Sequence, residues 1–242
     1  MRELDILYED GDVFVVFKDA GILSEATRKH EPVTVESLLT QRLRKGQSRS
    51  RLHVWLVHRL DRDTAGVMVV AKNEMACEFL KDRWHESVVK RYYAVTQGVP
   101  AGQSGILRGW LYEDANLFVR QVRERDYAGF VARSPDVRLK FAETEWEKIG
   151  ERRGLALVRL TLRTGRRNQI RVQLADAGWP ILGDSKYGRP APGDRGHLHL
   201  HAYSLTIPIP STGESRTFEV LPTRGMFPAI CPMAALRNSK MC

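Results

Sequence analysis

Short apolar runs and amphipathic stretches alternate along the chain, and their periods predict strands interspersed with separate helices. The run of valines and phenylalanines at positions 13–17 lies between polar and glycine-containing turns and predicts a buried strand over residues 12–18. Similar patterns predict strands over residues 67–72, 90–97, 143–149, 155–163, 197–207 and 218–220, with a hairpin over 107–122. Helical spacing predicts helices over residues 33–43, 74–86 and 167–177.

Two details of the helices follow from the same pattern. The second helix is expected to turn Met75, Phe79 and Leu80 inward, and Gly178 is expected to close the third. Because the strands do not alternate with helices at regular βαβ spacing, we expect an α+β protein. Its sheet should be mixed and largely antiparallel, with helices at the periphery.

Composition and charge narrow the class of protein. The 242 residues are 43% hydrophobic and 28% charged, which is enough for a sizeable core. A formal net charge of +9 favours a polyanionic partner, although many basic proteins bind no nucleic acid specifically. Three cysteines without metal or disulfide spacing fit a reducing compartment. With no apolar leader and no long apolar run, we expect a cytoplasmic protein with no membrane partner.

A polar segment at residues 57–66, Val-His-Arg-Leu-Asp-Arg-Asp-Thr-Ala-Gly, feeds directly into the apolar run 67–70. A carboxylate between arginines next to a buried strand can stay ionised and be held in a fixed direction. In this segment the chain resembles the RluA-type family of RNA pseudouridine synthases. The hallmark of that family is H-R-L-D, a basic residue and T-S/A-G, with the aspartate as the essential catalytic group. The resemblance assigns that role to Asp61.

A second segment strengthens the resemblance. Residues 164–173 and 178–188 match the family patterns T-G-R-x-H-Q-I-R-x-H and G-x-P-I-x-G-D-x-x-Y-G, in the same order. Asn168 and Gln173 stand where the family usually has histidine, and we expect these departures to bear on substrate identity. Arg171 matches the arginine that pairs with the catalytic aspartate in the family. A structural buried ion pair is the less favoured interpretation of Asp61 and Arg171.

The resemblance also implies a third catalytic residue. Residues 90–94, Lys-Arg-Tyr-Tyr-Ala, match a K-x-Y-x-A strand motif whose tyrosine stacks on the target uracil and assists loss of the proton from carbon 5. That residue is Tyr92. Side chains alternate along a strand, so Tyr92 and Tyr93 should face opposite ways. The ionised Asp61 would attack the ribose or the ring, or abstract a sugar proton, and the sequence leaves these routes open. The chemistry needs no cofactor and no metal.

The resemblance implies a central RNA-binding cleft that receives a flipped uridine. In the family the arginine of H-R-L-D fills the place of the flipped base, and Arg59 matches it. His58 is expected to be a structural member of the loop and not an acid or base. The expected substrate-binding residues are Arg59, Arg62, His58, Thr64, Ile181 and Leu182.

A basic run at residues 42–51 has the composition of an exposed, mobile loop, and a solvated loop is about as well supported as an RNA-binding one. The residues expected at the RNA backbone are Arg42, Arg44, Lys45, Arg49, Arg51, Arg166 and Arg167. The alternating histidines 197, 199 and 201 could suggest a metal. The family has a similar strand and uses none, so His201 is expected to be structural.

The resemblance covers residues 5–222 and predicts a free-standing catalytic domain over 1–222. A tail over 223–242 would pack as a short helix or stay loose. We expect a monomeric RNA pseudouridine synthase acting on uridine in structured rRNA or tRNA. A non-catalytic RNA-binding protein would have no need of an ionised acid facing RNA. A glycoside hydrolase would want a second carboxylate, and Asp63 and Asp184 are more simply turn or cap residues.

Overall fold

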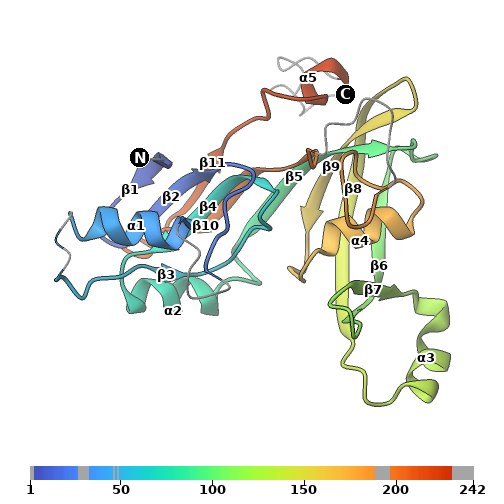
Figure 1. The fold of residues 1–242 in the computed structure, drawn as a ribbon, viewed down its shortest axis with the longest axis horizontal. Helices are drawn as coiled ribbons and strands as arrows, with labels where there is room; N and C mark the ends of the chain where they lie inside the picture. The colour runs from blue at the N-terminus through green and yellow to red at the C-terminus, as the bar shows by residue number, and fades with distance from the viewer. Residues whose placement is uncertain (1–2, 27–32, 46, 48, 189–196, 231–242) are drawn as a thin grey trace. The chain divides into compact units, whose positions relative to one another are not determined.

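The computed structural model describes residues 3–26, 33–45, 47, 49–188 and 197–230. The chain divides into two compact units. The first comprises residues 1–90 and 201–220, and the second comprises residues 91–200 and 221–242. Figure 1 labels the helices and strands of both units.

The first unit is built on a mostly antiparallel sheet with the order β1-β2-β4-β10, with β3 added to β4 and β11 added to β10. Only the β4–β10 pair is parallel among the pairs described in this unit. Its strands are β1 (Asp5–Glu9), β2 (Val13–Lys18), β3 (Trp55–Leu56), β4 (Ala65–Ala71), β10 (Leu200–Pro208) and β11 (Ser215–Glu219).

The close approach of β4 and β10 requires a glycine. Gly66 has a φ of 140°, and a Cβ there would lie 2.2 Å from the carbonyl oxygen of Ala202. The core of this unit is formed by alternating valines such as Val13 and Val69, which pack with Leu80 and with residues of β10. Two helices complete the unit: α1 (Val35–Leu43), which starts at a capping box of Thr34 and Ser37, and α2 (Glu74–Asp82).

Helix α2 departs from the predicted one in two ways. It ends at Asp82, four residues before the predicted end at 86. The prediction that Met75 faces inward was wrong, because its side chain is 80% exposed. The buried positions are Ala76, Cys77 and Leu80. The helix therefore turns a narrow stripe of three residues to the sheet, and Met75 lies one position outside it.

The second unit has a sheet with the order β5-β9-β8-β6-β7. Its strands are β5 (Val89–Gln97), β6 (Ser104–Glu113), β7 (Val119–Val122), β8 (Lys140–Arg152) and β9 (Leu155–Leu162). Its helices are α3 (Tyr127–Arg133), which follows a 3-10 turn η1 (Glu124–Asp126), α4 (Gln169–Asp176) and α5 (Phe227–Ile230). The hairpin β6–β7 and the strands β8 and β9 were predicted. α3 and β1 were not.

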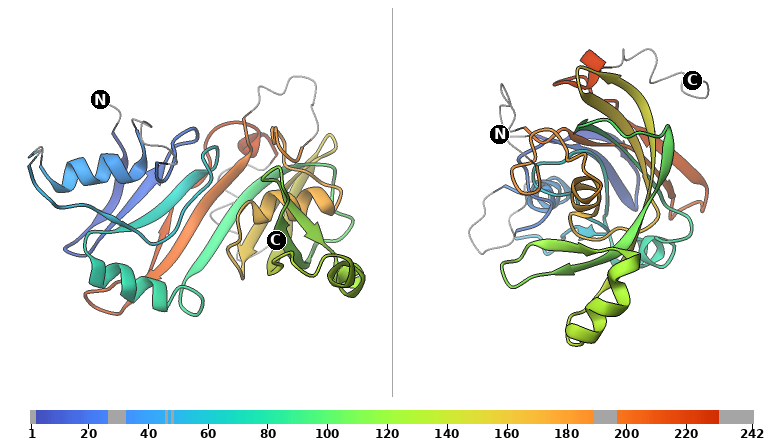
Figure 2. Two further views of the ribbon diagram at one scale, coloured as in Figure 1. Left: turned by 60° about the horizontal axis from the view of Figure 1, so that its bottom comes forward. Right: turned by 90° about the vertical axis from the view of Figure 1, so that its right-hand side faces the viewer.

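Helices α3 and α4 both lie near the β7 edge of this sheet (Figure 2), and their side chains contact opposite faces of it. On one face, Val172 of α4 packs on Leu111 and Ala142. On the other face, the ring centroids of Trp110 and Tyr127 are 4.2 Å apart. Since Trp110 and Leu111 are neighbours on one strand, their side chains project to opposite faces.

The observed architecture confirms the predicted α+β class with a mixed, largely antiparallel sheet. Helix α4 begins two residues later than predicted because Asn168 before it adopts a left-handed conformation, with φ of 53°. In the tail, α5 is a short helix, and residues 231–242 lie outside the described part of the chain. Among the described residues, no helix is long and apolar enough to cross a membrane.

Candidate active site

The main chain on both sides of Asp61 is fixed by groups from another part of the first unit. The buried Ser24 hydroxyl accepts from the Leu60 N–H at 3.1 Å and donates to the Leu60 carbonyl at 2.9 Å. On the other side, the Arg62 carbonyl accepts from the Gly21 N–H at 2.8 Å. The Thr64 N–H donates to the carbonyl of Asp61 itself at 3.1 Å and closes a turn. The carboxylate is therefore carried on a segment with little backbone freedom.

Lys18 contributes the strongest of these anchors. Its side chain is fully buried at the end of β2, and its Nζ donates to three carbonyl oxygens. These belong to Asp19 at 3.0 Å, Ile22 at 2.7 Å and Arg62 at 3.0 Å. A buried ammonium group is tolerated only where such partners replace water. Lys18 thus joins the turn after β2 to the Asp61 loop.

His58 is part of the scaffold of this loop, as predicted from the sequence. Its Nε2 accepts from the N–H of Val69 at 3.1 Å, and its ring packs on Trp84 with centroids 4.7 Å apart. Burial, with the Lys90 ammonium group nearby, lowers the pKa of His58 to about 3. The ring is therefore neutral near pH 7 and carries its proton on Nδ1, which leaves Nε2 as the acceptor. Its expected contact with substrate stays a prediction.

The other residues of the loop differ in exposure. Arg59 and Arg62 have side chains that are 62% and 63% exposed. Arg59 forms an ion pair with Glu25, and Arg62 donates to Asp63 at 3.0 Å. Thr64 is 2% exposed, so its side chain shapes the loop from inside. The expected contact of Thr64 with substrate stays a prediction.

Arg171 has a fixed carboxylate partner within the second unit. Its Nε and Nη2 donate to the two oxygens of Asp184 at 2.8 and 2.7 Å, which is a bidentate pair. Asp184 also accepts from the N–H groups of Lys186 and Tyr187, as expected for a turn residue. Burial by itself would raise the pKa of Asp184, but the hydrogen bonds and charge of Arg171 lower it below its usual value.

This pair was not predicted, since the sequence resemblance directs Arg171 to Asp61. Asp61 belongs to the first unit and Arg171 to the second. Their predicted pairing, and the predicted central cleft, stay predictions. Within the second unit, Asp184 holds Arg171 on the buried side of α4, where the arginine side chain is 10% exposed.

The two departures from the family pattern have different surroundings. Gln173 is 1% exposed; its amide accepts from Thr144 Oγ1 at 2.6 Å and donates to the carbonyls of Leu107 and Ala142. It therefore ties α4 to the sheet, and a direct effect on substrate identity is not supported by this position. Asn168 instead lies beside Arg171, with its Oδ1 3.5 Å from Nη1 of that arginine.

The remaining predicted substrate residues of the second unit are buried. Tyr92 is 7% exposed and Tyr93 is 1% exposed. Ile181 is fully buried, and Leu182 donates its N–H to the carbonyl of Val95 at 2.8 Å. The assignment of Tyr92 to the reacting face, and the substrate contacts of Ile181 and Leu182, stay predictions.

The predicted RNA-backbone residues vary in how they are held. Arg42 lies in the last turn of α1 and donates to Glu9 at 2.9 Å, so it belongs to the helix and not to the predicted loop. Arg44 is the C-cap residue of α1 and donates to the carbonyl of Leu52. Lys45, Arg49 and Arg51 are exposed, while residues 46 and 48 lie outside the described part. In the second unit, Arg166 donates to the carbonyl of Phe141 and Arg167 pairs with Glu113.

The histidines of the segment leading into β10 have separate partners. His201 Nε2 lies 2.8 Å from the carbonyl of Val220, and burial lowers the pKa of His201 to about 4, although that hydrogen bond acts in the opposite sense. His199 Nδ1 lies 3.3 Å from the carbonyl of Leu182. Among the described residues, no group of three or more potential ligand side chains is arranged to hold a metal ion.

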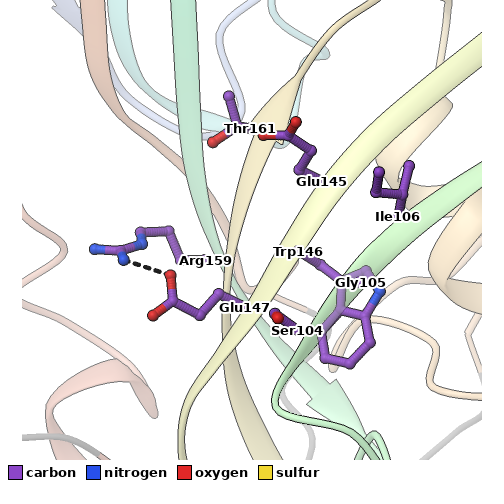
Figure 3. A pocket seen from close by; sticks show the side chains of 8 residues that line it. All are labelled: Ser104, Gly105, Ile106, Glu145, Trp146, Glu147, Arg159 and Thr161. Carbon is purple, nitrogen blue, oxygen red and sulfur yellow. Dashed lines mark hydrogen bonds and ion pairs between the residues drawn. The ribbon is translucent and has the colours of Figure 1, made fainter. Parts of the chain in front are cut away.

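A hollow of about 320 Å³ lies on the face of the second unit's sheet formed by β6, β8 and β9 (Figure 3). It is lined by Glu145, Glu147, Arg159 and Thr161, with Arg159 paired to Glu147. Cross-strand ion pairs of this kind are typical of a sheet face that is exposed to solvent. Neither Arg171 nor Tyr92 lines this hollow.

Two residues that organise the site were given no role by the sequence. Lys18 carried a detectable signal, because a lysine directly follows the apolar run of β2. Ser24 carried no such signal, because the neighbouring sequence does not distinguish an ordinary loop serine from one that hydrogen-bonds to the main chain of Leu60.

Comparisons with known proteins agree with the resemblance seen in the sequence. A family model described as RNA pseudouridylate synthase matches residues 12–176. The uncharacterized RNA pseudouridine synthase YlyB of Bacillus subtilis is 32% identical over 90% of this chain and 68% of its own length. The ribosomal large subunit pseudouridine synthase D of Blochmanniella floridana is 31% identical over 76% of this chain. The chain spans 54% of the latter and 58% of a further relative, YhcT of Bacillus subtilis.

Two solved structures share the fold. Human RNA pseudouridylate synthase domain containing 4 has a TM-score of 0.69 at 24% identity and covers 96% of this chain and 93% of its own. Human RNA pseudouridylate synthase domain containing 1 has a TM-score of 0.67 at 21% identity and covers 96% of this chain and 87% of its own. The match of the family model to most of the chain decides the matter: the chain belongs to the RNA pseudouridylate synthase family.

Proposed function

We propose that this chain isomerises uridine to pseudouridine in structured RNA, rRNA or tRNA, with Asp61 as its catalytic carboxylate. The observation that carries the proposal is the anchoring of the Asp61 loop. Buried groups of Lys18 and Ser24 fix the main chain on both sides of the aspartate. A carboxylate that must attack a sugar or a ring gains from such preorganisation, because its approach is set before the substrate binds.

Arg171 and Tyr92 complete the proposed machinery. Arg171 would stabilise ionised Asp61 through the N–H donors that Asp184 does not use, while Asp184 holds the guanidinium in place. Tyr92 would lie on the uracil face and assist loss of the carbon 5 proton. Arg59 would leave its ion pair with Glu25, and its side chain would fill the gap left by the flipped base.

The reaction is an isomerisation, so atoms balance without a co-substrate. The bond between nitrogen 1 and the ribose breaks, the uracil turns, and a bond forms between carbon 5 and the ribose. Carbon 5 then loses its proton to a base and nitrogen 1 takes up a proton, so that no atom is gained or lost overall. A non-catalytic RNA-binding protein is the alternative. The rigid setting of Asp61 favours the enzyme, since a carboxylate facing RNA repels phosphate. Action in the cytoplasm and as a monomer stays a prediction.

The test is a comparison of two neighbouring aspartates. Cells that lack the protein are supplied with wild type, Asp61→Asn or Asp63→Asn, and pseudouridines are mapped chemically across total RNA. Both changes remove one charge and little volume, but Asp63 is paired with exposed Arg62. We expect at least one pseudouridine to depend on the protein, to be lost with Asp61→Asn and to be kept with Asp63→Asn. If Asp61→Asn restores the modification, Asp61 is not the catalytic group. If wild type adds no pseudouridine to any RNA, the proposed activity is wrong.

A further inference from the structure

Three segments of the second unit meet around the side chain of Tyr187. They are the end of the β6–β7 hairpin, the residue before α4, and the turn that follows Asp184 (elements labelled in Figure 1). We call the surface they form the Tyr187 patch. It consists of Phe118, Asn168, Lys186 and Tyr187, all of which are partly exposed.

The hydroxyl of Tyr187 is held as an acceptor by two protein donors. The N–H of Val119 and the side-chain amide of Asn168 both donate to its oxygen, each at 3.1 Å. A main-chain N–H can only donate. The Asn168 amide is oriented by Arg171, because its oxygen faces the guanidinium. Both acceptor positions of the phenol oxygen are therefore occupied, and its own proton is left to donate elsewhere.

Among the described residues, the structure supplies no acceptor for that proton. The hydroxyl therefore presents a directed donor at a partly exposed position. A positive charge lies next to it, since Lys186 Nζ is 5.5 Å from the Tyr187 ring centroid and 4.5 Å from that of Phe118. One of the three donors of Lys186 is used by the carbonyl of Leu117 at 3.0 Å.

A directed O–H, an ammonium group and an aromatic face together fit a nucleic-acid strand. The hydroxyl and the ammonium group suit a phosphate oxygen, and the Phe118 ring suits a base or ribose. Other nearby cations are already neutralised, because Arg120 pairs with Asp114 at 2.8 Å and Arg167 pairs with Glu113. Lys186 is thus the cation of this region without a carboxylate partner among the interactions described.

We propose that the Tyr187 patch binds the RNA backbone beside the target nucleotide, with one phosphate accepting from Tyr187 and Lys186. This rests on the proposed function and extends it by naming a second contact. The same hydrogen bonds reach Arg171 through Asn168. Phosphate binding would therefore steady the side chain that we assign to the catalytic carboxylate.

The experiment measures RNA binding in an Asp61→Asn background, so that no turnover takes place. The probe is a fluorescein-labelled RNA hairpin with a uridine-rich loop, titrated at several salt concentrations. Lys186→Gln should weaken binding and reduce the slope of log affinity against log salt by about 0.7 to 0.9, the contribution of one phosphate contact. Lys81→Gln makes the same charge change at an exposed position of α2 and should leave the slope within error of the parent.

A second measurement locates the contact. A series of hairpins carries a neutral methylphosphonate in place of one loop phosphate, at a different position in each hairpin. At one position this replacement should weaken binding to the parent protein but not binding to the Lys186→Gln variant. Tyr187→Phe should lose the effect of the same position, and the melting temperature of each RNA-free variant reports any loss of folding. An unchanged salt slope for Lys186→Gln overturns the proposal, even if binding of inorganic phosphate falls. So does the absence of any position that couples to Lys186. Because wild-type pseudouridine formation is tested separately, neither result bears on the proposed activity.

Discussion

Acid should destabilise this protein through two histidines that the fold keeps neutral. His58 accepts a main-chain hydrogen bond with a ring nitrogen, and His201 is buried against the carbonyl of Val220. Their pKa values in the folded protein are about 3 and about 4, against an ordinary value near 6.5. Below pH 6.5 the unfolded chain therefore binds protons that the folded protein does not.

The sign and size of the effect follow from that difference. The stability contributed by each histidine is fully present above its unfolded pKa and is lost as the pH falls. Between pH 7 and pH 5 each group should lower the free energy of unfolding by about 2 kcal/mol. Together they remove about 4 kcal/mol, a large part of the roughly 5 to 15 kcal/mol typical of a folded domain. The pKa of Asp184 is lowered from its usual acidic value, so this residue affects the free energy of unfolding only at a lower pH than the histidines do.

Urea unfolding at pH 7, 6 and 5 measures these contributions, with His58→Gln and His201→Gln as variants. A glutamine at position 58 can still accept from the N–H of Val69 but does not titrate, so the pH dependence should flatten by about 2 kcal/mol. Exposed His85, changed to glutamine, is the control. If both variants keep the wild-type dependence on pH, the argument from burial is wrong.

Three further predictions concern the site. Arg171→Lys should lose most activity and some stability, because lysine cannot supply the two-donor fork that binds Asp184; a near wild-type rate in a tritium-release assay would contradict this. Tyr92→Phe should bind RNA normally yet release little tritium from carbon 5, and damage by Tyr93→Phe instead would show that the strand faces are assigned in reverse. Lys18→Met should leave buried carbonyl oxygens without a donor, and should therefore lower the free energy of unfolding in urea titrations by about 2 to 4 kcal/mol. The maximal rate should also fall. A change in the free energy of unfolding below about 0.5 kcal/mol would show that the Asp61 loop does not depend on Lys18.

The family and the broad fold could be predicted from the sequence, because both depend on local patterns. The segment around Asp61 and the one around Arg171 each lie within about a dozen residues, and the strand periods need only a few. Helix ends were less well predicted: α2 stops at Asp82 and α4 starts after a left-handed Asn168, which apolar spacing does not encode.

What the tertiary structure decided is which donor meets which acceptor. Lys18 reaches the Asp61 loop across 44 residues of sequence and Ser24 reaches it across 36. Gln173, which was expected to bear on substrate identity, points inward and accepts a hydrogen bond from Thr144. Arg171 forms its ion pair with Asp184, which lies in a turn later in the chain. Periodicity tells which face of an element is apolar, but a buried polar group takes its partner from whatever the packing brings within about 3 Å. That choice is made only when distant segments come together.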